Sequence, residues 1–225
     1  MTDDVTTSYP GQLSRWLIRL LGSPWLERLF ELWKSAQKII RGLADEGMYE
    51  VIYYESTLEL LDKRGERALV RKHEKVRYLQ NSIIAYQDQA WGDGEILINY
   101  RCTPGLPVDR YRPGKKTYIL ISLREVKNRG DEDEFNIEWE VRQGFLRQTE
   151  LWEAEINHRM KKLKIQVIFP SSRPPRRASL VQESSQRARP LSEDAQVRLP
   201  DGRWLVHWET SQPRLHETYS LRWEW

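Results

Sequence analysis

From about residue 49 onward, apolar and polar side chains alternate one by one in segment after segment of this chain. In DEFNIEWEVR the apolar positions are Phe135, Ile137, Trp139 and Val141, and the polar positions between them are Asn136, Glu138 and Glu140. Side chains of a β-strand point to opposite faces in turn, so this spacing predicts a strand with one buried face and one face in water. The repetition of the pattern predicts a mainly β protein.

Short runs of Gly, Pro, Asn and Asp separate the alternating segments, as turns require. Segments 49–61 and 67–79 flank the sequence DKRGE and predict a hairpin closed around Gly65. Further strands are predicted at 94–102, 116–127, 133–142, 149–158 and 162–170. Because many short strands follow one another with little helix between them, we expect residues 48–225 to form an antiparallel, jelly-roll-like β-sandwich.

The C-terminal end repeats the alternation with larger side chains. One face of the last segment carries Tyr219, Leu221, Trp223 and Trp225. The segment after the turn at Pro200-Asp201-Gly202 carries Trp204, Val206 and Trp208 on one face. We expect the tail to be a closing strand whose aromatic face packs against the Trp204 strand, with all four Trp residues buried.

Residues 170–195 break the alternation. They are rich in Pro, Ser and Arg, and five Arg stand against one Glu between Ser171 and Pro190. This composition predicts an exposed loop. The RRASL sequence around Ser179 also resembles the target of a basophilic kinase, although matches of this length are common by chance.

The N-terminal region follows a different period. Residues 1–10 are polar and predict a flexible tail, whereas apolar residues in 11–47 recur at spacings of three and four, which indicates an amphipathic helical segment. Between Gly11 and Leu43, six basic and two acidic residues give a net charge of +4. We predict that this segment binds a partner protein or a second copy of the chain. The candidate contact residues are Trp16, Trp25, Leu29, Trp33, Ala36 and Ile40.

The composition is that of a globular protein with a charged exterior: 39% of residues are hydrophobic, 31% are charged, and the net charge is +3. So small a surplus does not favour nucleic acid as a partner. The single cysteine, Cys102, allows no intrachain disulfide. Since neither a signal peptide nor an apolar run long enough to span a membrane is present, we expect a cytoplasmic protein.

No motif predicts catalysis, a metal site or a cofactor. The histidines show no metal-like spacing, and Cys102 is expected to be a small buried side chain. Glu138 and Glu140 could supply the carboxylate pair of a glycosidase, but the alternation favours a solvated outer face with Trp139 in the core. The sequence therefore favours a non-catalytic protein without metal or cofactor.

The sequence leaves three functions open. The leading one is an adaptor or regulatory protein that binds a partner protein through the helical segment of 11–47. The second is a membrane-surface protein whose basic, Trp-rich helix binds anionic lipid. The third is a carbohydrate-binding or glycoside-hydrolysing β-sandwich, with Trp91 and Trp152 as the platform because both stand in polar surroundings.

Overall fold

The computed structural model describes residues 47–225, which contain fourteen β-strands and one short 3-10 helix, η1 (Glu193–Ala195). The prediction of a mainly β protein is therefore confirmed. Residues 1–46 lie outside the described part of the chain, and with them the six candidate contact residues and almost all of the predicted helical segment. No helix within 47–225 is long and apolar enough to cross a membrane.

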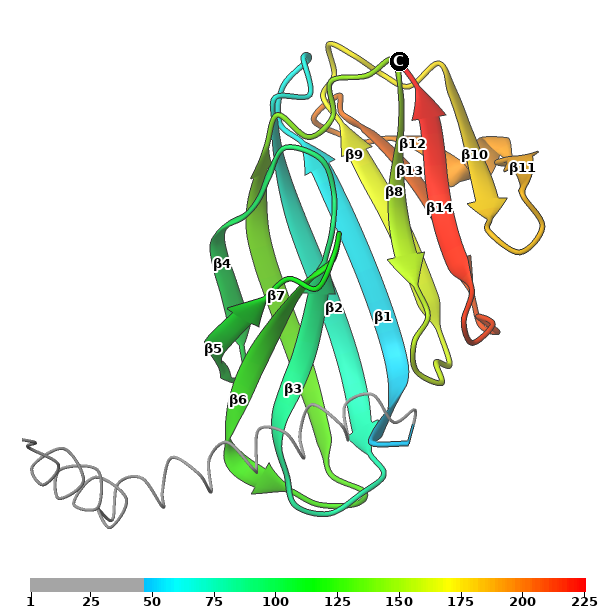
Figure 1. Cartoon of the computed structure of the whole chain (residues 1–225). Helices are drawn as coiled ribbons and strands as arrows, with labels where there is room; N and C mark the ends of the chain where they lie inside the picture. Colours follow the sequence, from blue (N-terminus) through cyan, green and yellow to red (C-terminus); the bar gives the residue numbers. More distant parts are fainter. Residues whose placement is uncertain (1–46) are drawn as a thin grey trace, which may run out of the picture. The chain divides into compact units, whose positions relative to one another are not determined.

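The largest sheet has seven strands in the order β12-β13-β9-β1-β2-β7-β4 (Figure 1). In chain order these strands are β1 (Tyr49–Leu60), β2 (Arg67–Tyr78), β4 (Glu95–Thr103), β7 (Glu132–Arg142), β9 (Leu163–Phe169), β12 (Gln196–Arg198) and β13 (Trp204–Thr210). β1 and β2 form the predicted hairpin. Gly65 in its turn has a φ of +73°, and a Cβ there would lie 1.8 Å from the carbonyl oxygen of Phe145, so a larger residue does not fit.

Two smaller sheets complete the described part of the chain. The four-stranded sheet has the order β11-β10-β14-β8 and the three-stranded sheet the order β3-β6-β5. Their strands are β3 (Ile83–Ala90), β5 (Leu106–Tyr111), β6 (Thr117–Lys127), β8 (Thr149–Glu155), β10 (Arg177–Gln182), β11 (Arg187–Pro190) and β14 (Thr218–Glu224). β3 and β8 are therefore edge strands, each paired on one side within its sheet.

Both smaller sheets pack on the same face of the seven-stranded sheet, which we call the inner face. Tyr86 of β3 stacks on Phe135 of β7 with ring centroids 4.1 Å apart. Trp223 of β14 meets Phe169 of β9 edge to face, with centroids 5.5 Å apart. The hydrophobic core lies between these layers, and the opposite, outer face of the large sheet carries the charged side chains that the alternation predicts.

The tail is held by packing, as predicted. Trp223 and Trp225 are only 2% and 5% exposed, and Tyr219 stacks on Trp208 of β13 at 5.0 Å between centroids. The expectation that Trp204 and Trp208 are buried is wrong, because both remain half-exposed. β13 lies next to the sheet edge, where only the three-residue strand β12 follows, so fewer side chains cover it.

One strand pair departs from the antiparallel prediction. β1 and β9 run parallel, from the pair Tyr54–Leu163 to the pair Glu59–Ile168, whereas the other strand pairs of the described residues are antiparallel. Period-two alternation shows which face of a strand is buried, but it does not show the direction of the neighbouring strand.

The prediction of an exposed loop at 170–195 is wrong for its middle part, which forms β10 and β11. Ala178 and Leu180 are buried, and β10 is paired with β14 on one side and β11 on the other. Ser179 therefore lies within a central strand rather than in a loop. The Arg and Ser residues around Ala178 and Leu180 obscure the short alternation of β10 in the sequence. Its two inward apolar side chains are both buried.

Candidate ligand-binding pocket

A pocket of about 240 Å³ lies on the inner face of the large sheet, between edge strands β3 and β8. Its floor comes from β1, β2 and β7, and its walls come from the end of β3, the loop after it, and β8. The second layer is interrupted here because the three-stranded and four-stranded sheets are separate, as Figure 1 shows. The pocket occupies this interruption.

Tryptophan rings form the walls of the pocket. Trp91, directly after β3, donates its indole N–H to Oε2 of Glu153 at 3.0 Å, and Trp152 of β8 donates its N–H to Oγ of Ser56 at 3.0 Å. The aromatic lining is completed by Tyr54, Trp139 and Phe145. Since both indole N–H groups have partners inside the protein, the two rings are fixed before any ligand arrives.

The turn that carries Trp91 is set by a glycine. Gly94 has a φ of +73°, and a Cβ at this position would lie 2.2 Å from the carbonyl oxygen of Arg142 at the end of β7. Only glycine allows this close approach of two backbones. The approach holds the loop from Trp91 to Gly94 against β7, and Trp91 lines the pocket from this loop.

Glu150 is the buried acid of the pocket. It lies on β8 in phase with Trp152 and Ala154, so its side chain points to the inner face and is 8% exposed. One carboxylate oxygen accepts the backbone N–H of Arg147 at 2.6 Å. Burial raises the pKa of Glu150, and the hydrogen bond from Arg147 offsets only part of this rise.

The cations of the pocket already have partners. Nζ of Lys72 donates to Asp88 at 2.7 Å and to the carbonyl oxygen of Gln89 at 2.6 Å, and it lies 5.0 Å from the centroid of the Trp139 ring. Arg147 pairs with Asp93 at 2.8 Å. The pocket therefore holds no cation whose charge is left unbalanced.

A buried polar network lies behind the pocket, between β2 and β3. Asp88 also accepts the hydroxyl of Tyr100 at 3.0 Å, and Glu74 accepts the hydroxyl of Tyr86 at 2.6 Å. Burial raises the pKa of Glu74 to about 7, although the Tyr86 hydrogen bond and Lys72 act in the opposite direction. For Lys72, burial alone would lower the pKa, but Asp88, Tyr54 and Glu74 together raise the pKa above its ordinary value and hold the ammonium charged.

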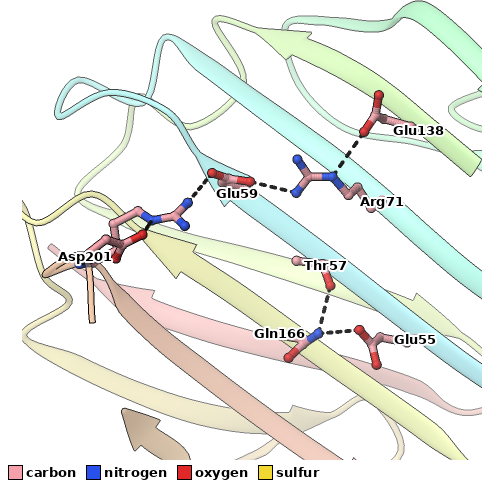
Figure 2. Close-up of polar contacts among 8 residues, drawn as sticks. Glu55, Thr57, Glu59, Arg71, Glu138, Gln166 and Asp201 are labelled. Carbon is pink, nitrogen blue, oxygen red and sulfur yellow. Dashed lines mark hydrogen bonds and ion pairs between the residues drawn. The ribbon is translucent and has the colours of Figure 1, made fainter. Parts of the chain in front are cut away.

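The outer face of the large sheet is built differently, as a ladder of polar contacts (Figure 2). Arg71 bridges Glu59 at 2.7 Å and Glu138 at 3.1 Å, and Gln166 donates to Thr57 at 2.9 Å. Trp139 is buried while Glu138 lies on this face, so the prediction of a solvated outer face is confirmed. Glu138 pairs with Arg71, and its side chain is 39% exposed.

The remaining chemical candidates are also accounted for. Cys102 is buried, its Sγ contacts the carbonyl oxygen of Pro104 at 3.2 Å, and burial raises its pKa to about 12, so the thiol is not activated. His73 contacts Glu134 at 2.6 Å. Within residues 47–225 no three His, Cys, Asp or Glu side chains are grouped so that they could hold a metal ion.

The structure brings together the two tryptophans that the sequence singled out, Trp91 and Trp152, on one pocket. Sequence reasoning missed Glu150 and Lys72, and it missed strand β3 altogether. A usable signal was present for both side chains, because each occupies an inward position of an alternating strand. The other inward members are apolar in β8, and in β2 they are apolar or aromatic except for Glu74. A polar residue at such a position is buried, and a buried charge needs a partner or a purpose.

No known protein family matches the sequence, and no curated protein matches it. Among solved structures the chain is similar to an M1 zinc metallopeptidase from Deinococcus radiodurans, with a TM-score of 0.48 and 9% identity; the match covers 80% of this chain and 45% of that one. A putative protease from Parabacteroides distasonis ATCC 8503 gives a TM-score of 0.46 and 11% identity, with coverage of 79% and 40%. This chain thus spans less than half the length of either protein, and a likeness at this level assigns neither a fold family nor an activity to it.

Proposed function

We propose that this protein is a non-catalytic binding protein and that its β domain holds a small organic ligand in the tryptophan-lined pocket. The observation that carries the proposal is the meeting of Trp91 and Trp152 on one pocket, with both indole N–H groups already bonded within the protein. Fixed aromatic walls around a small hollow suit a ligand with an apolar ring face, either an aromatic ring or a sugar ring.

For the architecture we propose a β-sandwich with jelly-roll-like layering, antiparallel except for the β1–β9 pair. The contacts of Tyr86 with Phe135 and of Trp223 with Phe169 support it, because they put both smaller sheets on one face of the large sheet. In this arrangement the smaller sheets act together as the second layer, and the pocket marks the gap between them.

The test is a titration of the full chain with glucose, N-acetylglucosamine, 2-phenylethanol and 2-phenylethylamine by isothermal titration calorimetry. We expect saturable binding of at least one probe. Trp91→Phe and Trp152→Phe should each weaken it about three- to tenfold, because an aromatic contact contributes about 0.5–1.5 kcal/mol beyond its area. Trp204→Phe is the matched control, since Trp204 lies on β13 and does not line the pocket. The proposal fails if no probe saturates, or if all three variants bind like the parent.

A second proposal rests on the amphipathic pattern of 11–47 and on the net charge of +4 between Gly11 and Leu43. We propose that this segment binds a partner protein or a second copy of the chain, with binding to anionic lipid as the alternative. A chain lacking residues 1–46 should keep the unfolding transition of the β domain and lose the association. Two measurements separate the alternatives. Co-sedimentation with a partner protein that the full chain shows and the shortened chain loses supports protein binding. Flotation of the full chain with anionic vesicles at low salt supports lipid binding.

A further inference from the structure

The charges that line the pocket do not balance. Each of its cations, Lys72 and Arg147, lies within 2.8 Å of a carboxylate, Asp88 and Asp93 respectively. Glu150 and Glu153 also line the pocket, and within the described residues neither has an ion-pair partner within 4.0 Å. The uncompensated charge of the pocket is therefore negative.

Glu150 is the less satisfied of these two acids, because Glu153 accepts hydrogen bonds from Trp91 and Ser220. It is 8% exposed, and its one hydrogen bond in the described structure comes from the backbone N–H of Arg147. A buried carboxylate loses its hydration, and a single neutral donor replaces only part of it. A positively charged group placed in the pocket would supply the missing interaction.

The aromatic walls favour the same charge. The faces of tryptophan rings attract cations, and two lysines of the protein already use this attraction: Lys72 lies 5.0 Å from the Trp139 centroid and Lys116 lies 5.3 Å from the Trp91 centroid. Both lysines hold their own carboxylates, Asp88 and Glu155, so they add no net charge that would repel a cation.

The size of the pocket limits the ligand. A cavity of about 150 Å³ accommodates benzene, and this pocket measures about 240 Å³. The difference leaves room for a short chain and a terminal polar group, but not for a long oligomer within the pocket itself.

We infer that the pocket binds a small organic amine, with the protonated amino group at Glu150 and an apolar or aromatic body between Trp91 and Trp152. This inference rests on the proposed binding function and narrows the ligand class. It favours a cationic ligand over two classes of neutral ligand, sugars and alcohols.

The experiment compares three probes of one shape and different charge: 2-phenylethylamine, 2-phenylethanol and 3-phenylpropanoate, at pH 8 by isothermal titration calorimetry on the full chain. We expect the amine to bind at least tenfold more tightly than the alcohol, and the carboxylate to bind most weakly. Glu150→Gln keeps an acceptor for the Arg147 N–H but removes the charge. It should reduce the affinity for the amine about tenfold or more and leave the affinity for the alcohol unchanged.

Glu134→Gln is the matched control, because it removes the same charge from an exposed position on the outer face of the large sheet. It should not change the ranking. If the three probes bind equally, or a sugar binds and the amine does not, the amine assignment is overturned while the pocket function stands. If no probe or sugar binds, both are overturned. The ranking in the unmodified protein decides the matter even where Glu150→Gln fails to fold.

Discussion

Arg71 and Lys72 are neighbours on β2, and their side chains leave the large sheet on opposite faces. Arg71 is 45% exposed on the outer face, where it shares Glu59 and Glu138 (Figure 2). Lys72 is 7% exposed on the inner face, where its main partner, Asp88, is 3% exposed. The shortest ion-pair distance is 2.7 Å in both cases. The two ion pairs therefore have equal distances, and their difference in burial decides how much each contributes to the stability of the fold.

The difference extends to whole faces. On the outer face, acids of β1 and β7 flank the bases of β2, and water can replace any partner that is lost. On the inner face water has little access, so an unmatched charge stays unmatched until a ligand supplies the partner. An unpaired carboxylate that would carry no information on the exposed outer face is therefore informative at the buried Glu150.

The largest effect should come from Lys72→Ala. Removing the ammonium leaves Asp88 buried without its counter-ion, which destabilises a protein by about 3–5 kcal/mol. Chemical denaturation monitored by tryptophan fluorescence measures the change. The double variant Lys72→Met with Asp88→Leu is the control, because replacing both partners by apolar side chains should restore most of the loss. A loss below 1 kcal/mol for Lys72→Ala would show that burial does not distinguish the two faces.

Glu74 should make stability depend on pH. Its pKa is about 7 in the folded protein, against 4.5 for an unperturbed group, so the folded state holds the proton more tightly. The stabilisation is complete below about pH 4.5 and is lost as the pH rises through 7, by an amount on the order of 3 kcal/mol. Glu74→Gln still accepts the Tyr86 hydroxyl and carries no charge.

We therefore expect Glu74→Gln to match the parent at pH 4.5 and to be the more stable protein at pH 8. Denaturation curves at several pH values between these limits provide the measurement. Glu95→Gln, at an exposed position of β4 with no ion pair in the described structure, serves as the control and should leave the pH profile unchanged. Equal profiles for Glu74→Gln and the parent would mean that Glu74 is not protonated more readily in the folded state.

The fold was predictable where one strand alone carries the information. Phe135 and Trp139 lie inside, and Gly65 closes the hairpin, because burial of one face and a left-handed turn leave local marks in the sequence. Strand pairing depends on distant segments, so the parallel β1–β9 pair had no local mark. β3 was missed because its buried Asp88 and exposed Ile84 reverse the expected alternation.

The site was predictable in part for a similar reason. Trp91 and Trp152 attract attention in any sequence because large aromatic side chains in polar surroundings are unusual. Their meeting on one pocket depends on which sheet edges lie side by side, and no local pattern specifies that. The proposed contact residues Trp16 to Ile40 lie outside the described residues, and their role stays a prediction.

The smallest effect should come from Arg71→Ala, which completes the comparison with Lys72. The substitution removes two carboxylate contacts of Arg71. Glu59 keeps its second partner, Arg203, and Glu138 is 39% exposed to water. Exposed pairs of this kind contribute about 0.2–1 kcal/mol, so the free energy of unfolding should fall by less than about 1 kcal/mol. Raising the salt concentration should reduce even this difference, because mobile ions screen exposed charges and leave the buried Lys72–Asp88 pair almost untouched. Denaturation at low and high salt measures Arg71→Ala and Lys72→Ala side by side. If Arg71→Ala lowered the free energy of unfolding by more than 2 kcal/mol at both salt concentrations, the outer face would stabilise the fold more than its exposure predicts.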